Sequence, residues 1–430
     1  MAKNPVSRPL GLLWLTLLLS ACGGGSSSDA AYTLGGSVSG LSSAGLVLAN
    51  GSETLSVAAG ASAFSFANTV SGSYAVSVKS QPSGQTCAIS GGSGTANANV
   101  SSVVVSCRNY LALVGLAGSA SLAGFSVDNS SAALSSTGST STTAPVAGVV
   151  MSSDGRYAHV SHSGDASIKS YSIASSGALS LVATASAVAD SRGLAISPDN
   201  SHVYVANYTD KSISQFNVGS SGALSAMSSA TVAAGSTPMA VVLTPNGSYA
   251  YAANLGDNTL SLYSVGSGGA LSPLSTASLS TGSGSQPLAL AVSPDSAYLY
   301  VLLKGSAKVA QYAIGSGGTL SAVATVATGT TPSGIALNAT GTCAYVANQG
   351  DGTVSQYIVS GGALTALSTA SVAAGSGPAG VAVTPDGAHV YVSNSAGATL
   401  SQYSVGSACA LSAVGSVAAG GSLPGAIAIR

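Results

Sequence analysis

Charge is the property that this sequence has least of. Charged side chains make up 5% of its 430 residues, and Glu53 is its only glutamate. An average soluble domain is about 25% charged. Lys plus Arg is 11 and Asp plus Glu is 12, so the net charge is −1. This composition argues against nucleic-acid binding, because such surfaces need clustered Lys and Arg to replace the counterions of the phosphates. It argues equally against disorder driven by charge.

Several motifs of catalytic and cofactor chemistry are also missing. The sequence contains no His-Glu-x-x-His zinc motif, no Gly-x-Ser-x-Gly nucleophile motif and no Gly-Lys-Ser/Thr phosphate loop. The cysteine spacings fit no zinc pattern. We therefore predict neither a metal site nor a cofactor.

The N-terminal residues have the organisation of an export signal. Lys3 and Arg8 precede an apolar run of about ten residues, which is too short for a bilayer span of roughly 20. The run ends in Leu-Ser-Ala-Cys22, and Gly and Ser dominate the next residues. This pattern resembles a bacterial lipoprotein signal. The other interpretation is an ordinary secretory signal that happens to end near a cysteine.

The lipoprotein resemblance implies a specific processing step and cellular location. Residues 1–21 would be removed, Cys22 would carry the lipid, and 22–31 would be a Gly/Ser tether. Several acyl chains on one cysteine give firm anchoring, whereas a single chain binds only marginally. Because Gly23 follows the cysteine where an Asp would retain the protein at the inner membrane, the resemblance implies the outer membrane of a Gram-negative cell. The periplasmic and the cell-surface faces both stay open.

Residues 32–107 predict a small all-β domain. Alternating segments are separated by turn residues at about 10-residue spacing, which is typical of a small sandwich. The expected strands are 32–38, 45–49, 63–66, 74–78, 86–90 and 100–107. The segments around Gly36 and Tyr74 resemble the prealbumin-like modules of bacterial surface proteins. Cys87 and Cys107 are expected to join the last two strands, since an exported protein meets an oxidising compartment.

From residue 108 onward the chain repeats. Each copy has a turn like Pro-Asp-Gly, and the second residues of successive turns lie 45, 47, 49, 45 and 46 apart: Asp154, Asp199, Asn246, Asp295, Thr340 and Asp386. Seventeen residues after each of these comes an aromatic residue: Tyr171, Phe216, Tyr263, Tyr312, Tyr357 and Tyr403. This period is typical of a four-stranded propeller blade. We expect the aromatic residues to fill the space between blades.

The two ends of the repeat region complete a seventh blade. Residues 108 to about 140 supply three strands of a blade that lacks its first strand. The segment 424–429, Pro-Gly-Ala-Ile-Ala-Ile, repeats the inner strand Pro-Ala-Gly-Val-Ala-Val at 378–383. We therefore predict that 108–430 form a seven-bladed β-propeller closed by the C-terminal strand, which removes open sheet edges.

A resemblance to a known family covers about three quarters of the chain. The segments Val-Tyr-Val-Ala-Asn207 and Ala-Tyr-Val-Ala-Asn348 are followed by Ser-Gln-Phe216 and Ser-Gln-Tyr357. These resemble the YVTN β-propeller repeats, and the Gly-Gly-Ala-Leu-Ser hairpins resemble the seven-bladed lactonase family, which includes 6-phosphogluconolactonase. Strand polarity then places Cys343 and Cys409 on the same propeller face in adjacent blades, so we predict a disulfide between them.

One propeller face carries the candidate ligand residues. Loops between second and third strands contain a recurrent aspartate, which in the simpler interpretation only accepts backbone N–H bonds. Arg192 occupies the repeat position next to the one where the inner strands usually have a proline, and it could hold a carboxylate or phosphate. His162 replaces the asparagine of other blades. The candidate ligand face consists of His162, Asp190, Arg192, Asp210, Lys211, Asp257 and Asp351.

Two functions follow from these observations. The ring fold, the lipid tether and the few catalytic side chains favour a cell-envelope scaffold that binds an envelope protein or a polysaccharide. The alternative, implied by the family resemblance, is a hydrolase that opens a lactone, with Asp190, Asp210 or His162 as base and Arg192 stabilising the oxyanion. The sequence leaves open whether the protein is an enzyme. Its few, scattered cations argue against a phosphorylated sugar.

Overall fold

The computed structural model describes residues 30–188 and 190–430. Regular structure in those residues is almost entirely β-strand, with two short 3-10 helices, η1 (Lys304–Ser306) and η2 (Ser407–Cys409). None of the helices in this part of the chain has the length and apolar character needed to cross a bilayer. The predictions for the signal, 1–21, and for lipidated Cys22 lie outside the described residues.

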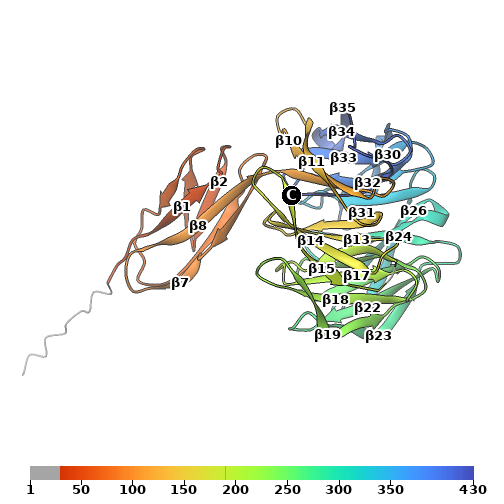
Figure 1. Ribbon diagram of the computed structural model, residues 1–430, viewed down its shortest axis with the longest axis horizontal. Helices are drawn as coiled ribbons and strands as arrows, with labels where there is room; N and C mark the ends of the chain where they lie inside the picture. Colours follow the sequence, from red (N-terminus) through yellow and green to blue (C-terminus); the bar gives the residue numbers. More distant parts are fainter. Residues whose placement is uncertain (1–29, 189) are drawn as a thin grey trace, which may run out of the picture.

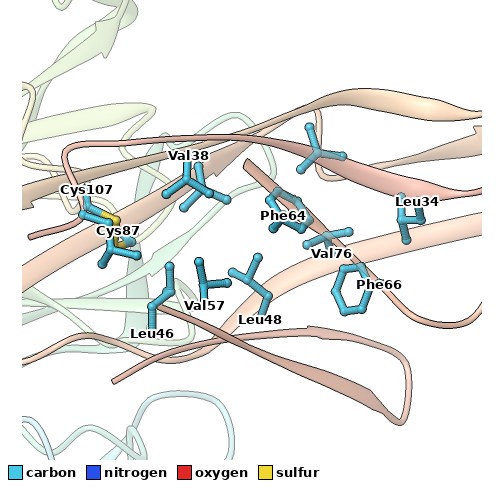
Figure 2. Close-up of a cluster of buried hydrophobic side chains, with 13 residues drawn as sticks. Leu34, Val38, Leu46, Leu48, Val57, Phe64, Phe66, Val76, Cys87 and Cys107 are labelled. Carbon is cyan, nitrogen blue, oxygen red and sulfur yellow. A yellow bond between two sulfur atoms is a disulfide. The ribbon is translucent and has the colours of Figure 1, made fainter. Parts of the chain in front are cut away.

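The N-terminal unit is built from two four-stranded sheets. The first contains, in order, β4 (Ala63–Ser65), β1 (Leu34–Ser39), β8 (Val100–Asn109) and β6 (Gln85–Ser90). The second contains β3 (Glu53–Val57), β2 (Leu46–Asn50), β5 (Gly72–Ser80) and β7 (Ser93–Ala96). Side chains from both sheets, such as Leu34 and Val103 from one and Leu48 and Val76 from the other, form one hydrophobic cluster (Figure 2).

The N-terminal unit contains the predicted disulfide and two strands that the sequence did not predict. The disulfide between Cys87 and Cys107 is present and joins β6 to β8, as predicted. The strands β3 and β7 were missed, because β7 is Ser-Gly-Thr-Ala and β3 begins with the polar residues Glu53 and Thr54. In addition, β8 continues through Asn109, so Arg108 lies in the N-terminal unit. The prealbumin-like assignment stays a prediction.

The propeller is confirmed, with seven four-stranded sheets between residues 111 and 429 (Figure 1). Blade 1 contains β36 (Pro424–Ile429), β9 (Leu111–Leu116), β10 (Ser121–Val127) and β11 (Leu134–Ser141). Blade 2 contains β12 (Val146–Met151), β13 (Tyr157–His162), β14 (Ser167–Ile173) and β15 (Leu179–Ser186). Blade 3 contains β16 (Ser191–Ile196), β17 (His202–Asn207), β18 (Ser212–Val218) and β19 (Leu224–Ala233). Blade 4 contains β20 (Pro238–Leu243), β21 (Tyr249–Asn254), β22 (Thr259–Val265) and β23 (Leu271–Ser280).

The remaining blades repeat the same order from the inner to the outer strand. Blade 5 contains β24 (Pro287–Val292), β25 (Tyr298–Leu303), β26 (Lys308–Ile314) and β27 (Leu320–Ala327). Blade 6 contains β28 (Pro332–Leu337), β29 (Cys343–Asn348), β30 (Thr353–Ser360) and β31 (Ala363–Ala373). Blade 7 contains β32 (Pro378–Val383), β33 (His389–Asn394), β34 (Thr399–Val405) and β35 (Leu411–Ala418).

Ring closure takes place in blade 1, as the repeats predict. The C-terminal strand β36 pairs antiparallel with β9, and Ile427 lies opposite Val114. Val114 belongs to a buried hydrophobic cluster that also contains Tyr391 and Leu400 from blade 7, and the partly buried Ile427 packs against this cluster. Closure therefore buries apolar surface as well as satisfying the edge of β9.

Two polar columns join blades 3 to 7 each to the following blade. A buried tyrosine in the second strand donates its hydroxyl to a carbonyl in the hairpin of the following blade: Tyr204 to Gly269, Tyr251 to Gly318, Tyr345 to Cys409 and Tyr391 to Ala132. A glutamine in the third strand accepts a backbone N–H from that blade: Gln215 from Leu271, Gln311 from Leu364, Gln356 from Leu411 and Gln402 from Leu134. These bonds satisfy buried polar groups and connect neighbouring blades through specific contacts.

The repeated aromatic column fills the space between blades, as predicted. All six aromatic residues are buried. Three of them also donate their hydroxyl backward to the outer strand of the preceding blade: Tyr263 to Ala233, Tyr357 to Ala327 and Tyr403 to Ala373. The disulfide between Cys343 and Cys409 is present and joins blade 6 to blade 7.

Strand direction gives the propeller two different faces. We call the face where inner strands begin the loop face; it also carries the loops between second and third strands. The opposite end, called the turn face, carries the turns like Pro-Asp-Gly and the outer hairpins. The N-terminal unit joins the turn face, because β9 begins there at Leu111 (Figure 1). Arg108 donates to the carbonyl of Ile173 at 2.7 Å, and Asn129 donates to Ser83 at 2.9 Å.

Candidate functional site

A cavity of about 490 Å³ lies on the axis of the ring, where the inner strands of all seven blades converge. Its wall is mostly Gly, Ala, Val and Leu. Small residues are required there because neighbouring inner strands approach closely. A Cβ on Gly193 would lie 2.7 Å from the carbonyl oxygen of Met239, and one on Gly380 would lie 2.5 Å from that of Gly425. The repeat thus produces a narrow channel that is largely apolar.

Arg192 is the charged residue in this wall, and it is the only one among the described residues that line the cavity. It belongs to β16, in the column where the other blades have Ala, Met, Leu, Ser or Gly. Its Nη2 atom lies 2.8 Å from Oδ1 of Asp190, and its guanidinium lies over the ring of Tyr208, 4.9 Å from the centroid. The Arg192 and Asp190 side chains are 31% and 24% exposed, so both can be reached from solvent.

The backbone holds this pair in place. Asp190 has a φ of +58°, a left-handed conformation that is uncommon for residues other than glycine. Its carbonyl accepts the N–H of Tyr208 at 3.1 Å, which joins the loop before β16 to the loop after β17. Ser161 of blade 2 donates its hydroxyl to the carbonyl of Arg192. The Nε atom of Arg192 is buried and has no hydrogen-bond partner among the described residues.

His162 does not reach the channel. Its side chain is fully buried in blade 2, and its Nδ1 atom lies 3.3 Å from the carbonyl oxygen of Ser167 and 3.9 Å from Asp165. Burial lowers the pKa of this histidine, opposed by the hydrogen bond to Ser167 and by the charge of Asp165. The structure therefore gives His162 a place in the interior of blade 2 and does not bring it to Arg192.

Blade 2 differs from the other blades around this histidine. In blades 3, 4, 6 and 7 an asparagine donates to a serine of the third strand, as Asn207 does to Ser214 at 2.9 Å. Blade 2 has His162 in the first position and Lys169 in the second, and Lys169 is 6% exposed. The Lys169 ammonium donates to the hydroxyl of Thr143, which in turn donates to Asp165 at 2.8 Å. Sequence reasoning missed Lys169, although it is the only charged residue in its column.

Asp257 and Asp351, two of the recurrent loop aspartates, each form hydrogen bonds between two loops of their own blade. Asp351 accepts the N–H of Thr330 at 2.6 Å and also the Thr330 hydroxyl, which lowers the pKa of Asp351. Asp257 accepts the N–H of Ser236 in the same way. Each bond joins the loop after the second strand to the loop before the inner strand. The simpler interpretation of Asp257 and Asp351, as acceptors of backbone N–H groups, therefore describes their contacts.

Asp210 and Lys211 lie at the exposed tip of the loop between β17 and β18, and neither lines the cavity. Lys211 has a φ of +52°, which fits its position in a tight turn. Tyr208 is the site residue that sequence reasoning missed. The sequence did contain a signal for it, because the equivalent position in blades 4, 6 and 7 is not aromatic: it is Leu255, Gln349 or Ser395.

The arrangement has defined chemical possibilities. A carboxylate and a guanidinium lie side by side at the edge of an apolar channel, so one can accept a proton while the other stabilises an oxyanion. Among the described residues no group of three or more His, Cys, Asp and Glu side chains is placed to hold a metal ion.

Solved structures share this propeller. A putative 6-phosphogluconolactonase from Bacteroides fragilis is 20% identical, with a TM-score of 0.68, over 75% of this chain and 98% of that one. A putative 6-phosphogluconolactonase from Bacteroides uniformis is 18% identical, with a TM-score of 0.68, over 75% and 99%. A periplasmic gluconolactonase from Pseudomonas aeruginosa is 20% identical, with a TM-score of 0.66, over 74% and 98%. At these identities the likeness shows the fold. No curated protein matches this sequence.

The family assignment comes from the sequence match. The family described as "Lactonase, 7-bladed beta-propeller" matches residues 123–229 and 211–372, which together make up more than half of the chain. The matched residues run from blade 1 through blade 6 and include Asp190, Arg192 and Tyr208. The chain therefore belongs to the seven-bladed lactonase propeller family.

Proposed function

We propose that this chain is a hydrolase that opens lactones at the loop-face mouth of its central channel. The observation that carries the proposal is the Asp190–Arg192 pair, which puts a carboxylate and a cation 2.8 Å apart beside an apolar cavity. Family membership favours this function over the non-catalytic scaffold that the sequence composition suggested. The scarcity of charge was a weak argument, because hydrolysis of an activated ester needs only a few well-placed groups.

The reaction can be written with these two residues. A lactone enters the channel mouth with its carbonyl oxygen toward Arg192. Asp190 takes a proton from a water molecule as the water oxygen attacks the carbonyl carbon, and Arg192 stabilises the oxyanion that forms. The intermediate then collapses, the ring C–O bond breaks, and the proton moves from Asp190 to the leaving alkoxide. The product is an open-chain hydroxy acid.

Tyr208 has a positioning role in this mechanism. Its ring covers one face of the Arg192 guanidinium, which keeps the cation in place and shields it from bulk water. A guanidinium held by a carboxylate on one side and an aromatic ring on another has little rotational freedom left. Its remaining donors are then directed at the substrate at a small entropic cost.

The charge of the channel bears on the substrate class. A phosphorylated sugar would need several converging cations, and Arg192 is the only charged residue in the described cavity wall. We therefore propose an uncharged sugar or acyl lactone as the substrate. This agrees with an exported protein, since phosphorylated sugars are cytoplasmic.

Export and lipid anchoring also stay proposals. The Leu-Ser-Ala-Cys22 segment and the Gly/Ser residues that follow support attachment to the outer membrane. The expected result is that cells fed labelled palmitate incorporate the label into the wild-type protein and not into a Cys22→Ser variant. Equal labelling of both proteins would remove the anchor from the proposal.

Lactone hydrolysis is tested by following acid release in a pH-stat. The full chain is compared with Arg192→Ala and Asp190→Asn on a panel of sugar and acyl lactones that includes 6-phosphogluconolactone. Hydrolysis well above the spontaneous rate, reduced by roughly a hundredfold or more in either variant, is the expected result. Lys211→Gln is the matched control, because this exposed cation lies on the same face outside the cavity. Acid release no faster than in buffer, or full activity in Arg192→Ala, would overturn the proposal.

A further inference from the structure

A second cavity lies where the N-terminal unit meets the turn face of the propeller. It has a volume of about 200 Å³ and is far from the loop face that carries Arg192. Its lining includes residues from the end of β8 in the N-terminal unit, the turn between β12 and β13, the hairpin between β14 and β15, and Arg430 after β36. This volume is below the roughly 300–1,000 Å³ of pockets for drug-sized ligands, so the cavity suits a small molecule.

Two arginines line this cavity in a protein that has few of them. Arg108 comes from β8 and Arg430 follows β36, and they account for two of the 11 Lys and Arg residues in the whole chain. Ring closure brings them together. Leu111 donates to the carbonyl of Arg430 at 2.7 Å, and Arg430 donates to that of Leu111 at 3.1 Å, three residues after Arg108.

The positive charge at the cavity is not neutralised by an ion pair. In the described part of the chain the charged pairs within 4 Å are His162–Asp165 and Arg192–Asp190, and neither involves Arg108 or Arg430. One carboxylate, Asp154, also lines the cavity, and its Oδ1 atom accepts from Ser152 and from the N–H of Arg156. Two guanidinium groups and one side-chain carboxylate therefore line this cavity, and its other side chains are uncharged.

Other groups in the wall add donors. Asn109 accepts at its Oδ1 atom from Gln85, whose amide lies 2.9 Å away, so its Nδ2 group is the part left to donate. Thr86 adds a hydroxyl. Arg108 is half-buried and already donates one N–H to the carbonyl of Ile173, which ties its guanidinium to blade 2. Arg430 is exposed as a whole residue, whereas its guanidinium is desolvated enough that burial lowers its pKa.

We propose that this junction cavity binds a small oxyanion, a carboxylate or a phosphate, between Arg108 and Arg430. Guanidinium groups bind both anions through paired, charge-assisted hydrogen bonds, and a partly enclosed wall weakens these bonds less than open solvent does. The bound ion would bridge the N-terminal unit and the first and last strands of the propeller. It would thus stabilise the junction through groups that take no part in lactone opening.

The test is isothermal titration calorimetry on the full chain, with inorganic phosphate in one series and gluconate in another, and with sodium chloride matching the ionic strength. We expect saturable binding of at least one of the two anions. Arg430→Gln and Arg108→Gln should each weaken it by roughly ten- to a hundredfold. Arg156→Gln is the matched control, since Arg156 lies on the same face outside this cavity and should leave the affinity within about twofold.

The outcomes separate a built site from general charge attraction. No saturable binding of either anion overturns the proposal, and so does an equal loss of affinity in Arg156→Gln. Because Arg108→Gln could disturb the junction by removing its bond to Ile173, Arg430→Gln is the deciding variant. Its lactone hydrolysis should equal that of the wild type, so the anion site and the proposed function can fail independently.

Discussion

The Nδ1 atom of His159 lies 3.0 Å from the hydroxyl of Ser170, at the position where blades 3, 4, 6 and 7 have a tyrosine that bonds to the next blade. His159 is fully buried, and its Nε2 atom has no partner. Blade 2 therefore lacks the tyrosine bond to its neighbour and keeps a buried imidazole in its place. This exchange makes the stability of the fold sensitive to acid.

The pH dependence follows from the direction of the shift. Burial lowers the pKa of His159 from 6.5 to about 4, so the unfolded chain binds a proton at higher pH than the folded protein does. Its contribution is fully present above pH 6.5 and is lost as the pH falls toward 4, at a cost of about 3 kcal/mol. Urea unfolding at pH 7.5 and 4.5 measures this. His159→Tyr should flatten the pH dependence. Equal pH slopes for wild type and His159→Tyr would contradict the assignment.

The tyrosine column offers a matched pair of deletions. Tyr251 and Tyr300 are both fully buried in the same column, but only Tyr251 has a partner for its hydroxyl, the carbonyl of Gly318 at 2.9 Å. Tyr251→Phe leaves that buried carbonyl without its donor and should cost about 1–3 kcal/mol of unfolding free energy. Tyr300→Phe should be neutral or stabilising. Chemical denaturation measures the unfolding free energies of the two variants. Equal losses in both would mean that the inter-blade hydrogen bond contributes nothing to stability.

Two glycines of the channel wall should differ in how well they tolerate substitution by alanine. A Cβ on Gly380 would lie 2.5 Å from the carbonyl oxygen of Gly425, whereas a Cβ on Gly425 would meet no atom within 4 Å. Gly380→Ala should therefore force apart two inner strands and cost about 1–3 kcal/mol. Gly425→Ala should change the unfolding free energy by less than about 0.5 kcal/mol. Thermal unfolding tests this, and a stable Gly380→Ala protein would show that the ring can widen.

The propeller disulfide should stabilise the boundary between blades 6 and 7. Cys343 and Cys409 are 66 residues apart, and in the chain-entropy account a crosslink over such a loop contributes about 4 kcal/mol. The double variant Cys343→Ala/Cys409→Ala should lose roughly 2–4 kcal/mol in denaturant unfolding. Peptide maps with and without reductant provide the control, since free thiols at both positions in the wild type would contradict the bond. The remaining disulfide, Cys87–Cys107, should stay intact in the variant.

Much of the fold could be predicted because the repeat appears in the spacing of residues that are close in sequence. A turn every 45 to 49 residues and an aromatic residue 17 positions later fix the four strands of each blade. Hydrogen bonding between strands close in sequence then places these residues without reference to the rest of the ring. The polar strand β7 escaped prediction because its residues carry no apolar alternation.

The candidate site was predictable only in part. The departure of Arg192 from its column was visible in the sequence, and so was that of His162. The sequence could not tell that Asp190 would turn through a positive φ to meet Arg192, or that Tyr208 would cover the guanidinium. It also could not tell that His162 would face the interior of blade 2.

The sequence by itself determined the blade, its number of copies and the strand that closes the ring, because each depends on residues that are near neighbours or repeats of one another. The tertiary structure alone decided which side chains meet at the channel and at the junction. Those sites join residues that are far apart in the chain, such as Arg108 and Arg430. Their proximity depends on how seven twisted sheets are arranged around the axis of the ring. The spacing of residues that are close in sequence does not specify this arrangement.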